Sequence, residues 1–246
     1  MQNINGKVVV VTGASAGIGK AIAIKLAENG VKVVLGARNT EQLEKVVEEI
    51  KCNGGEALFA NTDVSNKADL VKLVNLAIMR YGKLDVIVNN AGVARLSRID
   101  ELDIDGWDEM ININIKGTLY GMAAAIPVFK DQQSGHIVNI ISTSGIKIVP
   151  TQSVYAGTKN AIRTIAEAFR QESDGSIRIT GISPGYIKTD FAVKSVNAED
   201  MKIAASEVVQ QLAISPEAIA NAVIYAISQP KDVEVGDIVI RPSKQN

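Results

Sequence analysis

The chain has 246 residues, of which 46% are apolar and 22% are charged, and its formal net charge is −1. This composition is that of an ordinary globular protein that can bury a sizeable core. The balanced charge gives no indication of a nucleic-acid partner or of an anionic membrane surface as a partner. The single cysteine, Cys52, cannot form an intrachain disulfide, so we expect a reducing compartment and an inert thiol.

The first residues of the chain show no targeting segment. Such a segment needs a basic region, an apolar run and a cleavage site of small residues, whereas strand-like sequence already begins at residue 7. No apolar run approaches the roughly 20 residues that span a bilayer. We therefore expect a cytoplasmic protein that binds neither membrane nor nucleic acid.

Short β-branched runs alternate with longer amphipathic stretches along nearly the whole sequence. The continuous apolar runs predict strands buried on both faces, and helical spacing of apolar residues between them predicts helices. In chain order the pattern predicts a strand at 8–11, a helix at 17–29, a strand at 31–35, a helix that begins with Thr40 as its N-cap and runs to 51, a strand at 57–61, a helix at 67–81, a strand at 84–89, a long helix at 105–130, a strand at 137–142, a helix at 153–172, a strand at 177–183, a helix at 217–228 and a strand at 237–240.

Strands that are separated by helices pair in parallel through right-handed crossovers. The sequence therefore predicts an α/β fold, a doubly wound parallel sheet of the Rossmann type with helices on both faces. No repeat, low-complexity stretch or linker divides residues 1–246, which we expect to form a single dinucleotide-binding and catalytic domain. Residues 186–214 interrupt the alternation, and their mixed composition predicts an irregular substrate loop or lid.

A glycine-rich segment, residues 12–19, joins the first predicted strand to the first helix. Gly13, Gly17 and Gly19 have the spacing G-x-x-x-G-x-G, and the missing Cβ atoms allow a tight turn and a close backbone approach to a diphosphate. The N–H groups at the helix start near Ile18 favour such an anion. A structural turn without a ligand is the alternative, but the position after the first buried strand favours a dinucleotide site.

The end of the second strand indicates which dinucleotide binds. An acidic residue about 20 positions after the glycines suits the ribose of NAD, whereas an arginine suits the 2′-phosphate of NADP. This chain has Arg38 there, 19 residues after Gly19, and no acid. A guanidinium can pair with the phosphate in a bidentate way, although a solvated surface arginine is the alternative. The sequence thus predicts NADP(H).

Tyr155 and Lys159 are four residues apart on one face of the predicted helix 153–172. A nearby ammonium, with the positive nicotinamide of an oxidised cofactor, favours the phenolate of a tyrosine whose free pKa is about 10. Ser142 lies 13 residues earlier, at the carboxyl end of the fifth predicted strand, where ligands gather in such sheets. Its hydroxyl can hold a reacting oxygen while Tyr155 transfers a proton. By itself the pair also fits an exposed lysine beside a half-buried tyrosine.

The motifs in this order resemble those of the short-chain dehydrogenase/reductase family, from about residue 7 to residue 242. Residues 12–19 are similar to its glycine motif, and Asp63-Val64 resembles its adenine-binding acidic turn. Residues 89–92 resemble the signature that closes the fourth strand, and Pro184-Gly185 begins a segment similar to the one that contacts the nicotinamide.

The resemblance implies a catalytic group of Asn114, Ser142, Tyr155 and Lys159. Asn114 would hold a water that links Lys159 to solvent as a proton relay, and Lys159 would also bind the nicotinamide ribose. The residues implied to bind the cofactor are Gly13, Ser15, Gly17, Ile18, Gly19, Arg38, Asp63, Val64, Asn90, Ala91, Gly92, Tyr155, Lys159, Pro184, Gly185, Ile187 and Thr189.

Two features narrow the expected substrate and cofactor. Ala37 stands where NAD-preferring members of the family carry an acid, which agrees with Arg38. Residues 235–242 resemble the NADP-dependent branch that acts on small polar alcohols, including 3-hydroxy acids such as serine. We expect hydride transfer between NADP(H) and a small carbonyl or secondary alcohol. The alternatives are a 3-oxoacyl thioester reductase and a non-catalytic NADP-binding sensor.

Family resemblance further implies a homotetramer or homodimer that associates through helices 105–130 and 153–172. Trp107 and the apolar residues of the first of these helices are expected to serve packing. His136, the single histidine, has no accompanying cluster of cysteines, histidines or carboxylates. We therefore predict no metal site and a structural or surface role for His136.

Overall fold

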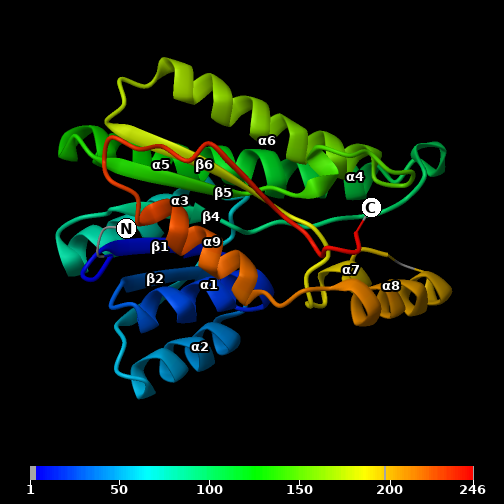
Figure 1. The fold of residues 1–246 in the computed structure, drawn as a ribbon, viewed down its shortest axis with the longest axis horizontal. Coiled ribbons are helices and arrows are strands. Elements are labelled where there is room, and N and C mark those ends of the chain that lie inside the picture. The colour runs from blue at the N-terminus through cyan, green and yellow to red at the C-terminus, as the bar shows by residue number, and fades with distance from the viewer. Residues whose placement is uncertain (1–3, 197, 246) are drawn as a thin grey trace.

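Seven parallel strands form one sheet in the order β3-β2-β1-β4-β5-β6-β7 in the computed structural model, which describes residues 4–196 and 198–245 (Figure 1). The strands are β1 (Val8–Thr12), β2 (Lys32–Ala37), β3 (Ala57–Asn61), β4 (Val86–Asn89), β5 (Gly135–Ile140), β6 (Ile177–Pro184) and β7 (Asp237–Ile240). The strand order reverses at β1, which pairs with both β2 and β4. The predicted doubly wound sheet of the Rossmann type is confirmed.

Helices cover both faces of this sheet (Figure 1). In chain order the helices of the described residues are α1 (Gly17–Glu28), α2 (Thr40–Cys52), α3 (Lys67–Tyr81), α4 (Ile104–Met110), α5 (Gly117–Gln132), α6 (Ser153–Glu172), α7 (Phe191–Lys194), α8 (Glu199–Leu212) and α9 (Glu217–Ile227). Three shorter helical segments are η1 (Ile99–Glu101), the π-helical η2 (Ile111–Lys116) and η3 (Thr143–Gly145). No helix in the described part of the chain is long and apolar enough to cross a membrane.

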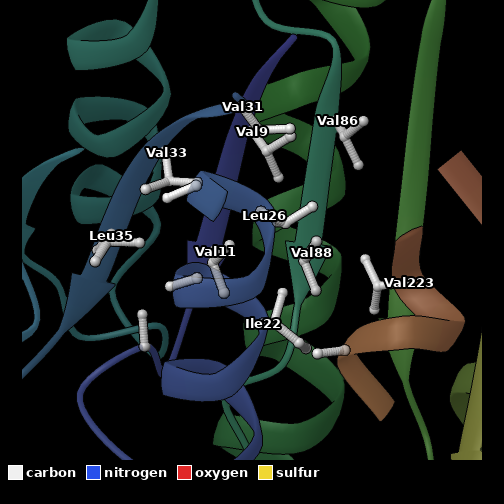
Figure 2. Packing of buried hydrophobic residues seen from close by; sticks show 14 of the residues in the cluster. Val9, Val11, Ile22, Leu26, Val31, Val33, Leu35, Val86, Val88 and Val223 are labelled. Atoms are coloured by element: carbon white, nitrogen blue, oxygen red, sulfur yellow. The ribbon is translucent and has the colours of Figure 1, made fainter. Parts of the chain in front are cut away.

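The core lies in two layers because successive strand residues point to opposite faces. On β1, Val9 and Val11 pack with α1 and α9, whereas Val8 and Val10 pack with α3 and α5. Figure 2 shows the first layer, where Ile22 of α1 lies over the sheet. Ile22 is fully buried, and burying such a side chain stabilises the fold by about 1.5–3 kcal/mol.

The predicted helix 105–130 is confirmed, since residues 104–132 are helical throughout. Its middle segment, η2, is a widened π-helical turn between α4 and α5. This segment reads Ile-Asn-Ile-Asn-Ile-Lys, and β-branched residues and asparagine form α-helix less readily than most residues. The widened turn coincides with Asn114, one of the predicted site residues, and such turns often occur at functional sites.

The predicted irregular character of residues 186–214 is wrong, because they contain two helices, α7 and α8, whereas their role as a substrate loop stays a prediction. An isolated parallel bridge between Ile187 and Ile214 closes this segment at its base, and we call residues 188–213 the excursion. Among the described residues of α8 none is buried. In Figure 1 this helix lies at the periphery of the molecule.

Several predicted boundaries shift by one or two residues, of which two concern residues discussed below. Asn39, rather than Thr40, caps α2, since its side-chain oxygen accepts a hydrogen bond from the Gln42 N–H at 3.0 Å. Thr40 is instead the first helical residue. Strand β5 ends at Ile140, so Ser142 lies just beyond it as the N-cap of η3. Both shifts are of the size by which local propensity misplaces the ends of elements.

Candidate active site

A cavity of about 1080 Å³ opens at the carboxyl ends of the central strands. Parallel strands bring their following loops together at this edge, and the reversal of strand order at β1 leaves a crevice there. The predicted site residues that line the cavity are Gly13, Ser15, Gly17, Ile18, Arg38, Asp63, Val64, Asn90, Ala91, Gly92, Ser142, Tyr155, Lys159, Pro184, Gly185, Ile187 and Thr189. Gly19 and Asn114 are not part of this lining.

The glycine segment and the segment after β4 are joined by Thr12 and Asn90. The buried Thr12 hydroxyl donates to the Val88 carbonyl at 3.3 Å and accepts from the N–H groups of Asn90 and Ala91 at 3.0 and 3.1 Å. In return the Asn90 side chain donates to the carbonyls of Thr12 and Gly13 at 2.9 and 3.2 Å. These bonds fix the shape of the turn before any ligand enters.

The glycines of this turn are required by close approaches of backbone. Gly13 has φ +65°, and a Cβ there would lie 2.8 Å from the Ala91 Cα atom. A Cβ on Gly19 would collide with the Gly13 carbonyl oxygen. Gly19 therefore does not line the cavity. Its missing Cβ allows α1 to pack against the turn.

The amino end of α1 has the properties of an anion site. Its N-cap, Ala16, makes no side-chain capping hydrogen bond, and its first turn contains no acidic residue. Unpaired N–H groups and the positive end of the helix dipole therefore face the cavity near Gly17 and Ile18. Gly17 itself has φ +55° and approaches Thr189, since a Cβ there would lie 3.2 Å from the Thr189 Cγ2 atom. This cradle fits a diphosphate.

Arg38 and Asp63 lie at the other end of the cavity, after β2 and β3. Arg38 is exposed, and its carbonyl accepts a hydrogen bond from the Asn61 side chain at 3.1 Å. Hydrogen bonds from Ser65 hold the pKa of Asp63 below its usual value, and the positive charge of Arg38 adds to this effect. The carboxylate is thus ionised at neutral pH beside a guanidinium that is open to solvent.

Ser142, Tyr155 and Lys159 come together at the carboxyl end of β5. Tyr155 and Lys159 are both buried in α6, and the Lys159 ammonium lies 5.9 Å from the centre of the Tyr155 ring. The Ser142 side chain interacts with the Tyr155 hydroxyl, and Lys159 donates to the Ile140 carbonyl at 3.0 Å. The Ser142 oxygen also accepts from the Ser144 N–H at 3.1 Å, which orients it.

Burial governs the protonation of this group. It raises the pKa of Tyr155 to about 12, and the interaction with Ser142 lowers it only in part. Burial likewise lowers the pKa of Lys159 to about 8. Burial thus favours the uncharged form of each group, and the stabilisation of the phenolate by the ammonium together with the nicotinamide stays a prediction. At neutral pH Tyr155 is a phenol.

Asn114 lies behind Gly92 rather than in the cavity. Its side-chain oxygen accepts from the Val93 N–H at 2.9 Å, and its amide nitrogen donates to the Val93 carbonyl at 2.9 Å. A Cβ on Gly92 would lie 3.3 Å from both the Asn114 oxygen and the Lys159 nitrogen. Asn114 is therefore close to Lys159, and its side chain is held by the backbone of Val93 and by the Thr158 hydroxyl.

Several residues beside the catalytic group were not predicted. Phe191 of α7 contacts the Tyr155 ring, with 6.0 Å between ring centres. Gln245 lines the same end, where its side chain accepts from the Tyr186 N–H at 3.0 Å and donates to the Thr143 hydroxyl at 3.3 Å. These contacts join segments that are far apart in the sequence, so no local sequence pattern predicts them.

His136 lies inside β5, at the opposite end of the strand from Ser142. It is buried, and its Nε2 atom is hydrogen-bonded to the Thr180 hydroxyl at 2.8 Å. Burial lowers its pKa to about 3, so the ring is neutral and structural. Within residues 4–196 and 198–245 no group of three or more His, Cys, Asp or Glu side chains is placed to hold a metal ion.

Sequence comparison identifies the class of protein to which this fold and site belong. Residues 7–200 match the family described as short chain dehydrogenase. An uncharacterised oxidoreductase of Listeria monocytogenes is 46% identical over 247 residues, with 99% of each chain covered. The chain therefore belongs to the short-chain dehydrogenase family and is a nicotinamide-dependent oxidoreductase.

Solved structures with the same fold carry such cofactors. An alcohol dehydrogenase of the archaeon Thermococcus sibiricus, complexed with 5-hydroxy-NADP, is 31% identical with a TM-score of 0.86 and 98% of each chain covered. A serine dehydrogenase in its closed form with NADP+ is 29% identical with a TM-score of 0.89, covering 97% of this chain and 96% of that one. A family member from Burkholderia phymatum with NAD is 25% identical, with a TM-score of 0.88, covering 97% and 90%.

Proposed function

We propose that this oxidoreductase uses NADP(H) to interconvert a carbonyl and a secondary alcohol on a small polar substrate. The proposal rests on one observation. Ser142, Tyr155 and Lys159 line the same cavity, and Arg38 lines its other end. The cavity volume of about 1080 Å³ is sufficient for a large ligand together with a small second one.

The preference for NADP(H) rests on Arg38. The guanidinium is exposed at the cavity rim, and the strand before it ends in Ala37 without an acid. A 2′-phosphate there would gain charge-assisted hydrogen bonds, whereas a carboxylate would repel it. The NADP+ bound to a serine dehydrogenase and the 5-hydroxy-NADP bound to an archaeal alcohol dehydrogenase support this choice. Because the Burkholderia phymatum protein binds NAD, the preference of this chain for NADP(H) over NAD(H) needs a direct test.

The diphosphate would lie on the amino end of α1, between Gly13 and Ile18, and Lys159 would hold the nicotinamide ribose. When bound, the cofactor supplies or accepts the hydride. Ser142 would hold the reacting oxygen through its hydroxyl, since Ser142 and Tyr155 line the same cavity. Tyr155, which is a phenol at neutral pH, would donate its proton to the oxygen of a carbonyl substrate.

The ammonium of Lys159 would then restore the proton of Tyr155. Its pKa of about 8 leaves it able to release a proton near neutral pH. Asn114, which lies behind Gly92, would support this proton relay. Its backbone carbonyl accepts a hydrogen bond from the Thr118 hydroxyl at 2.8 Å. In the oxidative direction the same groups would pass the proton outwards.

A substrate panel with NADPH, NADP+, NADH and NAD+ tests the proposal. Small 3-hydroxy acids, serine, simple secondary alcohols, their carbonyl forms and 3-oxoacyl thioesters make up the panel. We expect turnover of a small carbonyl or alcohol with NADP(H). Preferred turnover of 3-oxoacyl thioesters would replace the substrate class, and cofactor binding without turnover would favour a sensor.

The Tyr155→Phe variant tests the assignment of the proton donor. It should lower kcat by about 10²–10⁴-fold while leaving NADPH affinity nearly unchanged, because only the hydroxyl is removed. Binding is measured by NADPH fluorescence titration. An active Tyr155→Phe variant would overturn the mechanism but not the cofactor assignment.

A further inference from the structure

One buried hydroxyl links the widened turn η2 to the catalytic turn of α6. Thr158 is 2% exposed and stands in sequence immediately before Lys159. Its hydroxyl donates to the Tyr155 carbonyl at 2.7 Å and accepts from the Asn114 amide nitrogen at 3.0 Å. A threonine hydroxyl has one hydrogen to donate, so the direction of both bonds is defined.

Every polar group of Asn114 is used in this arrangement. One amide hydrogen bonds to the Val93 carbonyl and the other to Thr158, while the side-chain oxygen accepts from the Val93 N–H. Val93 directly follows Gly92 in the segment that lines the cavity. A continuous chain of hydrogen bonds therefore runs from the cavity segment after β4, through Asn114 and Thr158, to the backbone of Tyr155.

The position of Thr158 within α6 gives this chain its effect. Adjacent helical residues are rotated by about 100°, so fixing one side chain fixes the rotation of the helix around its own axis. Tyr155 and Lys159 flank Thr158 on this turn, and small misplacements of reacting groups lower rates strongly. Asn114, in the widened turn η2, reaches Thr158 across to α6.

We infer that Thr158 is a positioning residue, which locks the rotation of α6 so that the Tyr155 hydroxyl and the Lys159 ammonium face the reacting oxygen. This inference rests on the proposed catalytic roles of those two residues. It assigns to Thr158 no contact with substrate or cofactor. It also gives the Asn114 side chain a second task, that of holding Thr158.

The matched pair Thr158→Val and Thr158→Ser tests the inference in the full chain. Valine keeps the shape but removes both hydrogen bonds, whereas serine keeps both bonds and loses one methyl group. We expect Thr158→Val to lower kcat about tenfold with the substrate KM changed less than about twofold, and Thr158→Ser to retain kcat within about twofold. Thr164→Val, at an exposed position of the same helix, is the control and should match the parent chain.

Two readouts separate positioning from stability. The dissociation constant of NADPH, measured by fluorescence titration, should stay within about twofold in Thr158→Val, and the pH profile of kcat/KM should shift in that variant alone. A lower Tm with kcat and the pH profile unchanged would overturn the inference, because the hydroxyl would then be structural only. If Thr158→Val does not fold, Thr158→Ala is used instead. Asn114→Ala should then also lower kcat, and the double variant with Thr158→Ala and Asn114→Ala should have a kcat no lower than that of the single variants.

Different experimental results would reject the proposed function and this inference. A fully active Tyr155→Phe variant removes the catalytic role, whatever Thr158 does. Full kcat in a folded Thr158→Val variant, with Tyr155→Phe inactive, would reject the positioning role alone.

Discussion

The cofactor end of the cavity and the excursion 188–213 are built on opposite physical principles. At the cofactor end, Gly13 and Gly19 lie where an added Cβ would meet backbone atoms, and Thr12 and Asn90 satisfy one another's polar groups. In the excursion, α8 buries none of its described residues and packs mainly against α7. The first region is stabilised by close packing and tolerates little change, whereas the second has room to change shape.

The difference has a functional consequence. NAD and NADP share the same diphosphate, so a rigid cradle suits both. Substrates differ, and α8, which buries none of its described residues, can vary without disturbing the sheet. Tyr155 stands at the boundary, since it belongs to α6 but contacts Phe191 of the excursion.

The largest effect is expected from Gly19→Ala, which attacks the rigid region. The new Cβ collides with the Gly13 carbonyl, and backbone there cannot move without breaking the Asn90 bonds. We expect a loss of about 3 kcal/mol in the free energy of unfolding and at least about tenfold weaker NADPH binding. Urea denaturation and fluorescence titration measure the two effects.

The matched control is Gly157→Ala in α6, where an added Cβ meets nothing within 4 Å. This variant should gain about 0.5–1 kcal/mol, because alanine loses less backbone entropy than glycine in a helix. Equal stability of the two alanine variants would mean that the glycine turn is not close-packed.

Arg38→Asp should reverse the cofactor preference. Loss of charge-assisted bonds to the 2′-phosphate, together with repulsion by a carboxylate, is worth about 2 kcal/mol, or about 30-fold in affinity. The KM for NADPH should therefore rise about 30-fold, while the KM for NADH stays equal or falls. Steady-state kinetics with both cofactors measures the ratio, and an unchanged KM for NADPH would refute the NADP(H) assignment.

A pH profile examines the catalytic group at the boundary of the two regions. Burial lowers the pKa of Lys159 to about 8, so its charged form is lost as the pH rises through that value. For carbonyl reduction, kcat/KM for NADPH should be constant below pH 8 and fall about tenfold per pH unit above it. In a Lys159→Arg variant, whose cation persists, the residual activity should lack this decrease. A decrease that persists in Lys159→Arg would assign it to another group.

The smallest effect is expected in the excursion. Ile203 of α8 is 56% exposed, so Ile203→Ala should change the free energy of unfolding by less than about 0.5 kcal/mol. Ile22→Ala in α1 removes a fully buried side chain and should cost about 2–5 kcal/mol. Urea denaturation compares them. A loss above about 1 kcal/mol for Ile203→Ala would mean that α8 is packed in solution and that the contrast between the regions is false.

The sequence predicts the rigid region well because its requirements are local. Gly13, Gly17 and Gly19 occupy one turn, and the apolar runs of β1 and β4 need no partner to be recognised. Tyr155 and Lys159 are likewise four residues apart in the sequence. Only the position of Ser142 beside them depends on the fold. The roles assigned to these residues remain predictions that the experiments above address.

What the sequence does not predict depends on contacts between distant residues or on solvation. The widened turn around Asn114 is stabilised by Val93 and Thr158, which lie 21 and 44 residues away. The phenol state of Tyr155 follows from its burial, which no spacing in the chain encodes.

The bond between Thr12 and Asn90 also bears on how the protein folds. These residues are 78 positions apart, and β1 reaches its partner β4 only after β2 and β3 have been passed in the chain. Contacts of such large sequence separation require costly loop closure and form slowly. A nascent chain that has not yet reached β4 therefore has the glycine motif without Asn90, whose side chain fixes the shape of the turn.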